Sequence, residues 1–276
     1  MARPYEDPPG AGGVAFGVPS LTRVVKALLI ANVAVFLIQW VLFDGWMPRA
    51  FTWTEEAFAL CPVQWHRFPL VPFWQLLTYG FLHASPEHVI MNMLGLYFFG
   101  TMLESEIGDR RFLIFYLGSV VVAGACQLGL GLSLGQVGPV VGASGGVLAI
   151  VCAMATLRPM TRVIFFVFPM TLRTMALIFL AVDLFRVVGQ LKGGHNDVAS
   201  FAHLSGALFG YLAVRQSWIW RDPVAQVESW RERRQEAQEA SDEERLDALL
   251  QKISREGIHA LSSSERAFLK RVSQRK

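Results

Sequence analysis

The chain has 276 residues, of which 53% are apolar and 17% charged, with a net charge of +3 at neutral pH. Its mean hydropathy of +0.38 excludes an ordinary soluble globular domain. The composition predicts a protein that crosses a membrane several times. About half of the charges lie after Trp218, where 12 Lys and Arg accompany 11 Asp and Glu, so this end of the chain is expected to be solvated.

Apolar segments recur along the chain at lengths that fit membrane crossing, since a helix rises 1.5 Å per residue through a core about 30 Å thick. We expect six spans, at about residues 24–43, 88–103, 112–132, 144–158, 172–188 and 200–218. The aromatic, proline-rich segment 44–86 and the connector 160–171 fit the membrane interface. The prediction is an all-α polytopic fold.

Three regions follow from this pattern. Residues 1–20 are rich in Pro and Gly without an apolar core, which predicts a flexible tail and no cleavable signal peptide. Residues 21–218 form the six-span domain. Residues 219–276 form a small helical C-terminal region, with capping-box signals at Ser241-x-x-Glu244 and Ser262-x-x-Glu265.

An even number of spans places both termini on one side of the membrane. Basic residues are concentrated on that side, at Arg23, Lys26, Arg110, Arg111, Arg158, Arg162, Arg173, Arg215 and Arg221. The opposite loops contain Arg49, Arg67 and Lys192. Because cytoplasmic loops carry the excess of Lys and Arg, we expect both termini in the cytoplasm.

Ser144 is the first candidate for chemistry, because one hydroxyl lies among Gly142, Gly145 and Gly146 at the start of the fourth span. Small residues of this kind are also common wherever membrane helices pack closely, so the motif alone does not establish catalysis. The fourth span has only about 14 residues, roughly 21 Å of helix, and its start should lie below the membrane surface. The serine is therefore expected at the floor of a cavity.

His203 is the candidate base for this serine, because ionisable residues inside membranes are costly and indicate function. Ala202, Gly206 and Gly210 recur every four residues and allow the sixth span to approach another helix closely. If that helix is the fourth span, the imidazole can activate the serine hydroxyl. No acid falls at a comparable place, which predicts a dyad; Asp183 is expected to pair with Arg186 one turn later.

His88 and Asn92 are four residues apart and share one face at the start of the second span. Even-numbered spans run in the same direction, so these two residues, Ser144 and His203 should meet at one end of the bundle. An amide and an imidazole there can stabilise an oxyanion together with the backbone N–H of Ser144. Alternatively, the pair could serve only to hold the loop.

Together these motifs resemble the rhomboid intramembrane serine proteases. The resemblance rests on Gly142-x-Ser144-Gly145, on His203 with Gly206 and Gly210, and on His88 with Asn92, and it covers about residues 20–218. It implies a six-helix bundle in which Ser144 is the nucleophile, His203 its base, and His88 and Asn92 oxyanion stabilisers. Glu104 and Gly108 also match the family pattern, whereas Gln75 follows Trp74 in place of arginine and Leu148 replaces a common aromatic residue.

The resemblance implies an intramembrane serine endopeptidase that cleaves transmembrane segments of other proteins. The partners it implies are these substrates and the lipid bilayer, and no nucleic acid. Residues 242–269 look similar to a short region attached to some bacterial rhomboids, which implies a bacterial plasma membrane. No metal or organic cofactor is implied, and Cys61, Cys126 and Cys152 lack metal or redox spacing.

Two alternatives stand beside this interpretation. The string Gly142-Ala-Ser144-Gly-Gly146 also fits the nucleophile elbow of soluble hydrolases, but that motif requires an α/β sheet, which six apolar spans exclude. A transporter or a non-catalytic client-binding membrane protein could also line a path with buried His, Asn, Ser and Asp.

Overall fold

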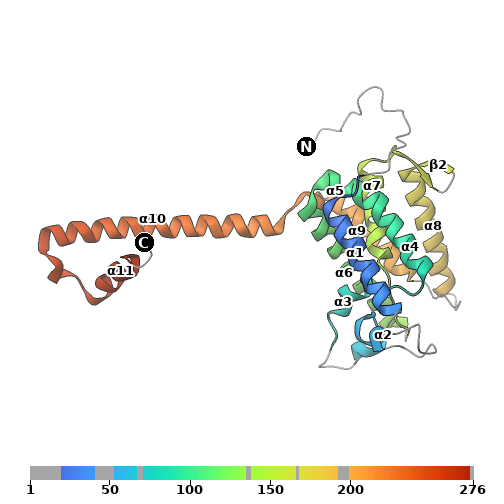
Figure 1. Ribbon diagram of the computed structural model, residues 1–276, viewed down its shortest axis with the longest axis horizontal. Coiled ribbons are helices and arrows are strands. Elements are labelled where there is room, and N and C mark those ends of the chain that lie inside the picture. The colour runs from blue at the N-terminus through green and yellow to red at the C-terminus, as the bar shows by residue number, and fades with distance from the viewer. Residues whose placement is uncertain are drawn as a thin grey trace, which may run out of the picture. The chain divides into compact units, whose positions relative to one another are not determined.

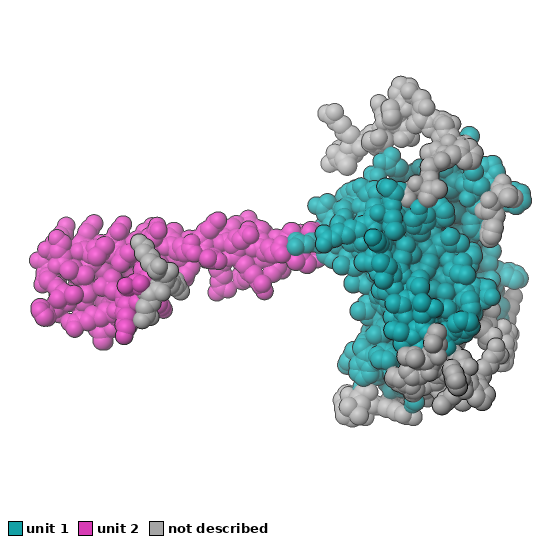
Figure 2. All heavy atoms as spheres, viewed as in Figure 1, with its two compact units in different colours: residues 1–221 teal, residues 222–276 magenta. Residues whose placement is uncertain are grey.

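The computed structural model describes residues 20–40, 53–66, 71–134, 138–165, 168–191 and 199–273. The chain divides into two compact units, Met1–Arg221 and Asp222–Lys276, coloured teal and magenta in Figure 2. Almost all of the predicted N-terminal tail lies outside the described residues, as do Arg49, Arg67 and Lys192.

The first unit is a bundle of helices (Figure 1). Its long helices are α1 (Arg23–Gln39), α4 (Pro86–Gly95), α5 (Thr101–Ile107), α6 (Asp109–Leu134), α7 (Ser144–Leu157), α8 (Leu172–Leu191) and α9 (Ser200–Arg215). A π-helical stretch, η4 (Leu96–Gly100), joins α4 to α5. The segment between α1 and α4 holds the short helices α2 (Trp53–Phe58), η2 (Pro62–His66), α3 (Gln75–Thr78) and η3 (Tyr79–Phe81).

Two features differ from the predicted all-α bundle of six spans. Residues 162–171, which lie in the predicted interfacial connector 160–171, form a hairpin of strands β1 (Arg162–Phe165) and β2 (Phe168–Thr171), in which Arg162 pairs with Thr171. Among the described residues, only Asp109–Ser133 within α6 is both long and apolar enough to cross a membrane by itself. The helices α1, α7 and α9 have 17, 14 and 16 residues and fall short on length.

Side-chain caps determine where two helices begin. Pro86 begins α4, and the hydroxyl of Ser85 accepts a hydrogen bond from the His88 N–H at 3.2 Å. The buried carboxylate of Glu104 accepts bonds from the N–H groups of Val24 and Val25 at 2.9 and 2.8 Å, so it satisfies free donors at the start of α1. These caps link α5 to α1 and set the direction in which His88 leaves the loop.

Helix α7 lies at the centre of the bundle, with most of its residues buried. Its packing against α9 depends on two glycines. A methyl group at Gly206 would overlap the carbonyl oxygen of Gly145, and one at Gly210 would overlap that of Ala149. The two backbones can therefore touch only because these positions lack side chains, which brings the start of α7 against the start of α9.

The second unit contains α10 (Pro223–Glu256), η6 (Ile258–Ala260) and α11 (Ser263–Ser273), with a small core of Leu249, Leu261 and Phe268. The predicted capping box at Ser262 forms: the Ser262 N–H donates to Glu265 at 2.7 Å, and the Glu265 N–H donates to the Ser262 hydroxyl. These bonds, with those from Lys252, lower the pKa of Glu265 to about 2. Ser241 instead lies inside α10, where the helix already satisfies its backbone.

Candidate active site

The site begins at the amino end of α7, where the chain enters through a strained turn. Gly142 has φ of +126°, which favours glycine, and its N–H donates to the carbonyl of Tyr79 at 2.9 Å. Val140 and Leu60 exchange two backbone hydrogen bonds just before this turn. The loop preceding Ser144 is thus fixed to the segment between α1 and α4.

Ser144, His203 and Asp183 form a continuous chain of hydrogen bonds. The Ser144 hydroxyl lies 2.6 Å from Nε2 of His203, and Nδ1 of the same ring lies 3.0 and 3.1 Å from the two carboxylate oxygens of Asp183. Because a carboxylate can only accept, the ring carries its hydrogen on Nδ1 and leaves Nε2 free to accept the serine proton. This is the arrangement that serine activation requires.

The contact of Asp183 with His203 corrects the predicted dyad. The spacing predicts that Asp183 pairs with Arg186, and the Arg186 guanidinium does lie 3.8 Å from the Asp183 carboxylate. Arg186 is exposed, however, whereas the carboxylate is buried beside the imidazole. The oxygen Oδ1 of Asp183 lies near both partners. Hydropathy gives the length of α8 but not its rotation about its own axis, so this contact could not be read from spacing alone.

His88 and Asn92 lie on one face of α4, and His88 borders the space beside Ser144. The point where a Cβ atom of Gly142 would stand lies 2.7 Å from Nε2 of His88 and 3.6 Å from the Ser144 hydroxyl oxygen. The Ala84 N–H points at Nδ1 of His88 at 3.5 Å, which favours a hydrogen on Nε2. Asn92 is buried, and its amide nitrogen has no hydrogen-bond partner among the described residues.

The backbone at the start of α7 supplies further donors. The first intrahelical bond of α7 runs from the Val147 N–H to the Ala143 carbonyl, and Ala143 provides no side-chain cap. Free N–H groups at a helix amino end carry a partial positive charge. These N–H groups and the unpaired amide of Asn92 are donors of the kind that stabilise a developing oxyanion.

Gly145 and Gly146 allow neighbouring helices to pack closely against this helix end. A Cβ atom at Gly145 would lie 2.7 Å from the Ala123 side chain, and one at Gly146 would lie 2.9 Å from Val120. Both contacts are with α6. The amino end of α7 is therefore enclosed by α6 and α9. The polar groups around it come from α4, from α8 through Asp183, and from α9 through His203.

Gln75, where the sequence departs from the family pattern, holds the loop that contacts Val140. Its buried amide oxygen accepts from the Cys61 N–H at 3.2 Å and from the Trp65 indole at 3.3 Å. Its amide nitrogen donates to Gln64 at 2.8 Å and to the Glu56 carbonyl at 3.1 Å. Gln75 thus acts as a structural hub that a sequence pattern alone would not reveal.

A second buried histidine, His83, lies five residues before His88, and their rings meet edge to face at 5.1 Å. Gln39 bonds both the N–H and the carbonyl of His83, while neither ring nitrogen has a hydrogen-bond partner among the described residues. Burial and the neighbouring His88 lower the pKa of His83 to about 4. His83 is therefore neutral at physiological pH and packs behind His88.

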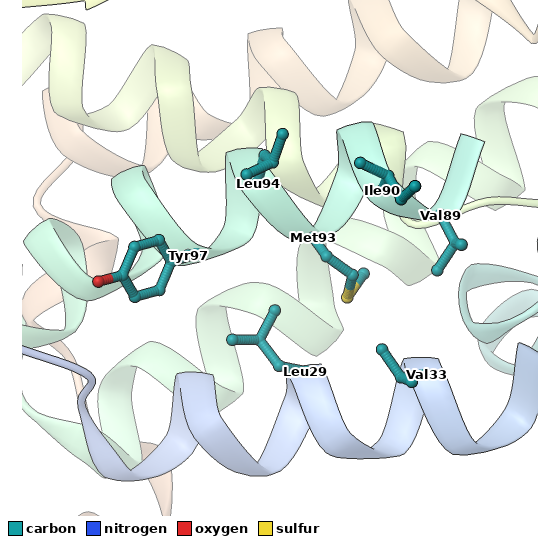
Figure 3. A pocket seen from close by; sticks show the side chains of 7 residues that line it. All are labelled: Leu29, Val33, Val89, Ile90, Met93, Leu94 and Tyr97. Carbon is teal, nitrogen blue, oxygen red and sulfur yellow. The ribbon is translucent and has the colours of Figure 1, made fainter. Parts of the chain in front are cut away.

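The opposite face of α4 is apolar. With α1 it forms a groove of about 320 Å³ lined by Leu29, Val33, Val89, Ile90, Met93, Leu94 and Tyr97 (Figure 3). The exposed surface of this groove is apolar, so it offers no group for chemistry. Nor does any group of three or more His, Cys, Asp or Glu side chains within the described parts of the chain suit a metal ion.

Comparison with known protein families matches residues 72–218 to the Rhomboid domain. The chain belongs to the rhomboid family. This confirms the resemblance carried by the motifs around Ser144, His203 and His88. Residues 232–275 match a family of unknown function (DUF6576), so the C-terminal region has relatives of its own.

Individual relatives agree with this membership. The chain is 28% identical over 213 residues to the human presenilin-associated rhomboid-like protein, mitochondrial, covering 76% of this chain and 53% of that protein. It is 30% identical over 218 residues to Rhomboid protein 1, mitochondrial, of Saccharomyces cerevisiae, covering 78% and 57%. The chain thus spans about half the length of the curated relatives it matches.

The names of these relatives contradict the predicted bacterial plasma membrane, because they describe mitochondrial proteins. That prediction is wrong. It rested on the likeness of residues 242–269 to a region attached to some bacterial rhomboids. The distribution of basic residues reports only the side of a membrane on which loops lie and carries no information about which membrane it is.

Proposed function

We propose that this protein is an intramembrane serine endopeptidase that hydrolyses peptide bonds in or near transmembrane segments of membrane-protein substrates. The observation that carries the proposal is the hydrogen-bonded chain from the Ser144 hydroxyl through His203 to Asp183. Family membership supports it, because the resemblance to rhomboid proteases assigns Ser144 as the nucleophile and His203 as its base. Lipid and a transmembrane substrate are the partners that this activity requires.

The geometry supports a two-step acyl transfer. Nε2 of His203 takes the proton as the Ser144 oxygen attacks the scissile carbonyl carbon, and the carboxylate of Asp183 stabilises the resulting imidazolium. The tetrahedral oxyanion accepts hydrogen bonds from the amino end of α7, from Asn92 and from His88. The imidazolium then protonates the leaving amine, and water, activated by the same ring, hydrolyses the acyl-enzyme.

The proposed setting is a six-span bundle formed by α1, the α4–α5 pair and α6 to α9, with the termini on one side of the membrane. Helix α7 is only 14 residues long, about 21 Å, so its amino end lies roughly 10 Å below the surface of a 30 Å core when its other end reaches the opposite surface. A polar site at that depth needs a water-filled cavity enclosed by protein, which fits the ring of helices around Ser144.

A fluorophosphonate probe tests the proposal directly, because it reacts with an activated serine. The wild-type protein should be labelled at Ser144, as read by mass spectrometry, and should cleave a transmembrane test substrate. Ser144→Ala should lose both labelling and cleavage, and His203→Ala should lose both while keeping the same thermal unfolding midpoint. Cleavage by purified Ser144→Ala protein, or no labelling of a folded wild-type protein, would sink the assignment.

A further inference from the structure

The first turns of α10 carry an unusual distribution of side chains. Val224, Val227, Arg231 and Arg234 follow one another at intervals of three or four residues, which places them on one stripe of the helix, with Trp230 beside it. Val224, Val227 and Trp230 are 44%, 48% and 55% exposed. The guanidinium of Arg234 lies over the Trp230 ring, 5.3 Å from its centroid. This surface, the Val224–Arg234 stripe, is therefore apolar, aromatic and basic.

Acidic residues occupy a different side of the same turns. Glu228, Glu232 and Glu236 are spaced by four residues and form a second stripe, and all three are exposed. Glutamates four residues apart repel one another along an isolated helix, so local helix stability does not favour this stripe. Arg233 lies away from the Val224–Arg234 stripe, but Arg231 and Arg234 stand with Trp230 and the valines, apart from the glutamates. Such a separation is typical of a helix that lies on a surface which is both apolar and negatively charged.

The position of the stripe in the chain identifies that surface. Helix α9 ends at Arg215, the turn η5 (Trp218–Trp220) follows, and α10 begins at Pro223. Trp218 and Trp220 are also exposed, as expected for residues at the boundary between lipid and water. If α9 spans the bilayer as proposed above, on which this inference rests, the tether leaves the first turns of α10 close to the headgroups.

We infer that the Val224–Arg234 stripe docks on an anionic lipid surface. Val224, Val227 and the Trp230 ring enter the headgroup boundary, Arg231 and Arg234 pair with lipid phosphates, and the glutamate stripe faces water. An anionic bilayer attracts the arginines and repels the glutamates, so the electrostatic field itself selects this rotation of the helix. The short tether keeps the stripe at a high local concentration near the bilayer, which allows so small a surface to bind.

Photocrosslinking of the full chain tests this inference. The photoreactive residue p-benzoylphenylalanine is introduced at Val227 or, as the matched position, at Glu236, and single copies are placed in nanodiscs containing phosphatidylglycerol and phosphatidylcholine. Mass spectrometry should find at least tenfold more lipid adduct at position 227 than at position 236. A crosslink from position 227 to the helical bundle, equal yields at both positions, or no adduct at either would overturn the inference.

Two controls separate lipid docking from its premises. The same probe at the exposed Leu177 of α8 should yield lipid adduct; its absence would show that the bundle is not embedded in the bilayer, a failure of the proposed function rather than of the stripe. Arg231→Glu should lower the adduct yield at position 227 several-fold, whereas Arg233→Glu, on another side of the helix, should change it little. Equal yields in nanodiscs of phosphatidylcholine alone would refute the anionic preference.

Discussion

Replacing Asp183 with asparagine is the sharpest test of how His203 is held. An aspartate at this place accepts the Nδ1 hydrogen and keeps Nε2 free for the Ser144 proton. An asparagine amide can instead donate to Nδ1, which moves the ring hydrogen to Nε2 and removes the base. Asp183→Asn also leaves the imidazolium of the transition state without its counter-charge.

The size of the effect follows from the 3.0 Å separation of Nδ1 and the carboxylate. Two unit charges at this distance interact by about 5 kcal/mol at an effective dielectric constant of about 20. Arg186, 3.8 Å from the same oxygen, offsets part of this attraction. A loss of about 3–5 kcal/mol corresponds to a fall in kcat of roughly 10²- to 10⁴-fold, near the 10⁴-fold known for this change in soluble serine protease triads.

The measurement is the cleavage rate of a transmembrane substrate at saturating concentration, with fluorophosphonate labelling as a second readout. Asp183→Asn should retain substrate affinity and the wild-type unfolding midpoint while kcat falls. Arg186→Gln is the matched control: it removes the other partner of Asp183 and should change kcat by less than about threefold, since its charge is exposed. A folded Asp183→Asn protein with wild-type kcat would refute the orienting role.

Three further predictions concern packing, the oxyanion and pH. Gly206→Ala should destabilise the protein by about 2–3 kcal/mol, because the new methyl group overlaps the Gly145 carbonyl; Gly189→Ala, with nothing within 4 Å, should be neutral or slightly stabilising in the same thermal assay. Asn92→Ala should lower kcat by about 10²-fold with KM little changed; a change confined to KM would assign Asn92 to substrate binding. Lowering the pH from 6.5 towards 4 should protonate the unfolded form of His83 before the folded form, so stability falls by up to about 3 kcal/mol. His83→Phe should flatten this dependence of the unfolding midpoint, and an unchanged slope would contradict it.

The elements that sequence predicted well are those set by local rules. Periods of apolar residues located the helices, and small residues at intervals of four predicted the close face of α9 that now holds Gly206 and Gly210 against α7. The shared direction of the even-numbered spans then predicted that Ser144 and His203 lie at the same end of the bundle. These inferences needed only helix length and the order of the spans, which hydropathy supplies.

Other features depend on tertiary contacts that no local rule encodes. The rotation of α8 about its axis decides whether Asp183 faces His203. The i,i+3 spacing of Asp183 and Arg186 correctly indicated one partner of the carboxylate but not the second. The strands around Phe165 and Phe168 lie in a connector whose alternation is too short to separate from a loop. Ser241 carries a capping signal that is overridden because α10 continues through it.

The substitution at Leu148 and the contact of Asp183 belong to one physical account. An imidazole that must accept a proton and then carry a charge needs both a fixed orientation and a counter-charge. Rhomboid proteases commonly fix the ring by stacking an aromatic residue on it, and here a leucine stands at that position, partly buried against the core. Both carboxylate oxygens of Asp183 contact Nδ1 of His203, so the hydrogen bond fixes the direction of the ring and supplies a negative charge. Asp183 can therefore provide the orientation that stacking would otherwise provide. Leu148→Phe should therefore restore the part of kcat that the Asp183→Asn protein loses through misorientation of the ring, measured as the cleavage rate of the same substrate. The part of kcat that Leu148→Phe does not restore measures the contribution of the negative charge of Asp183.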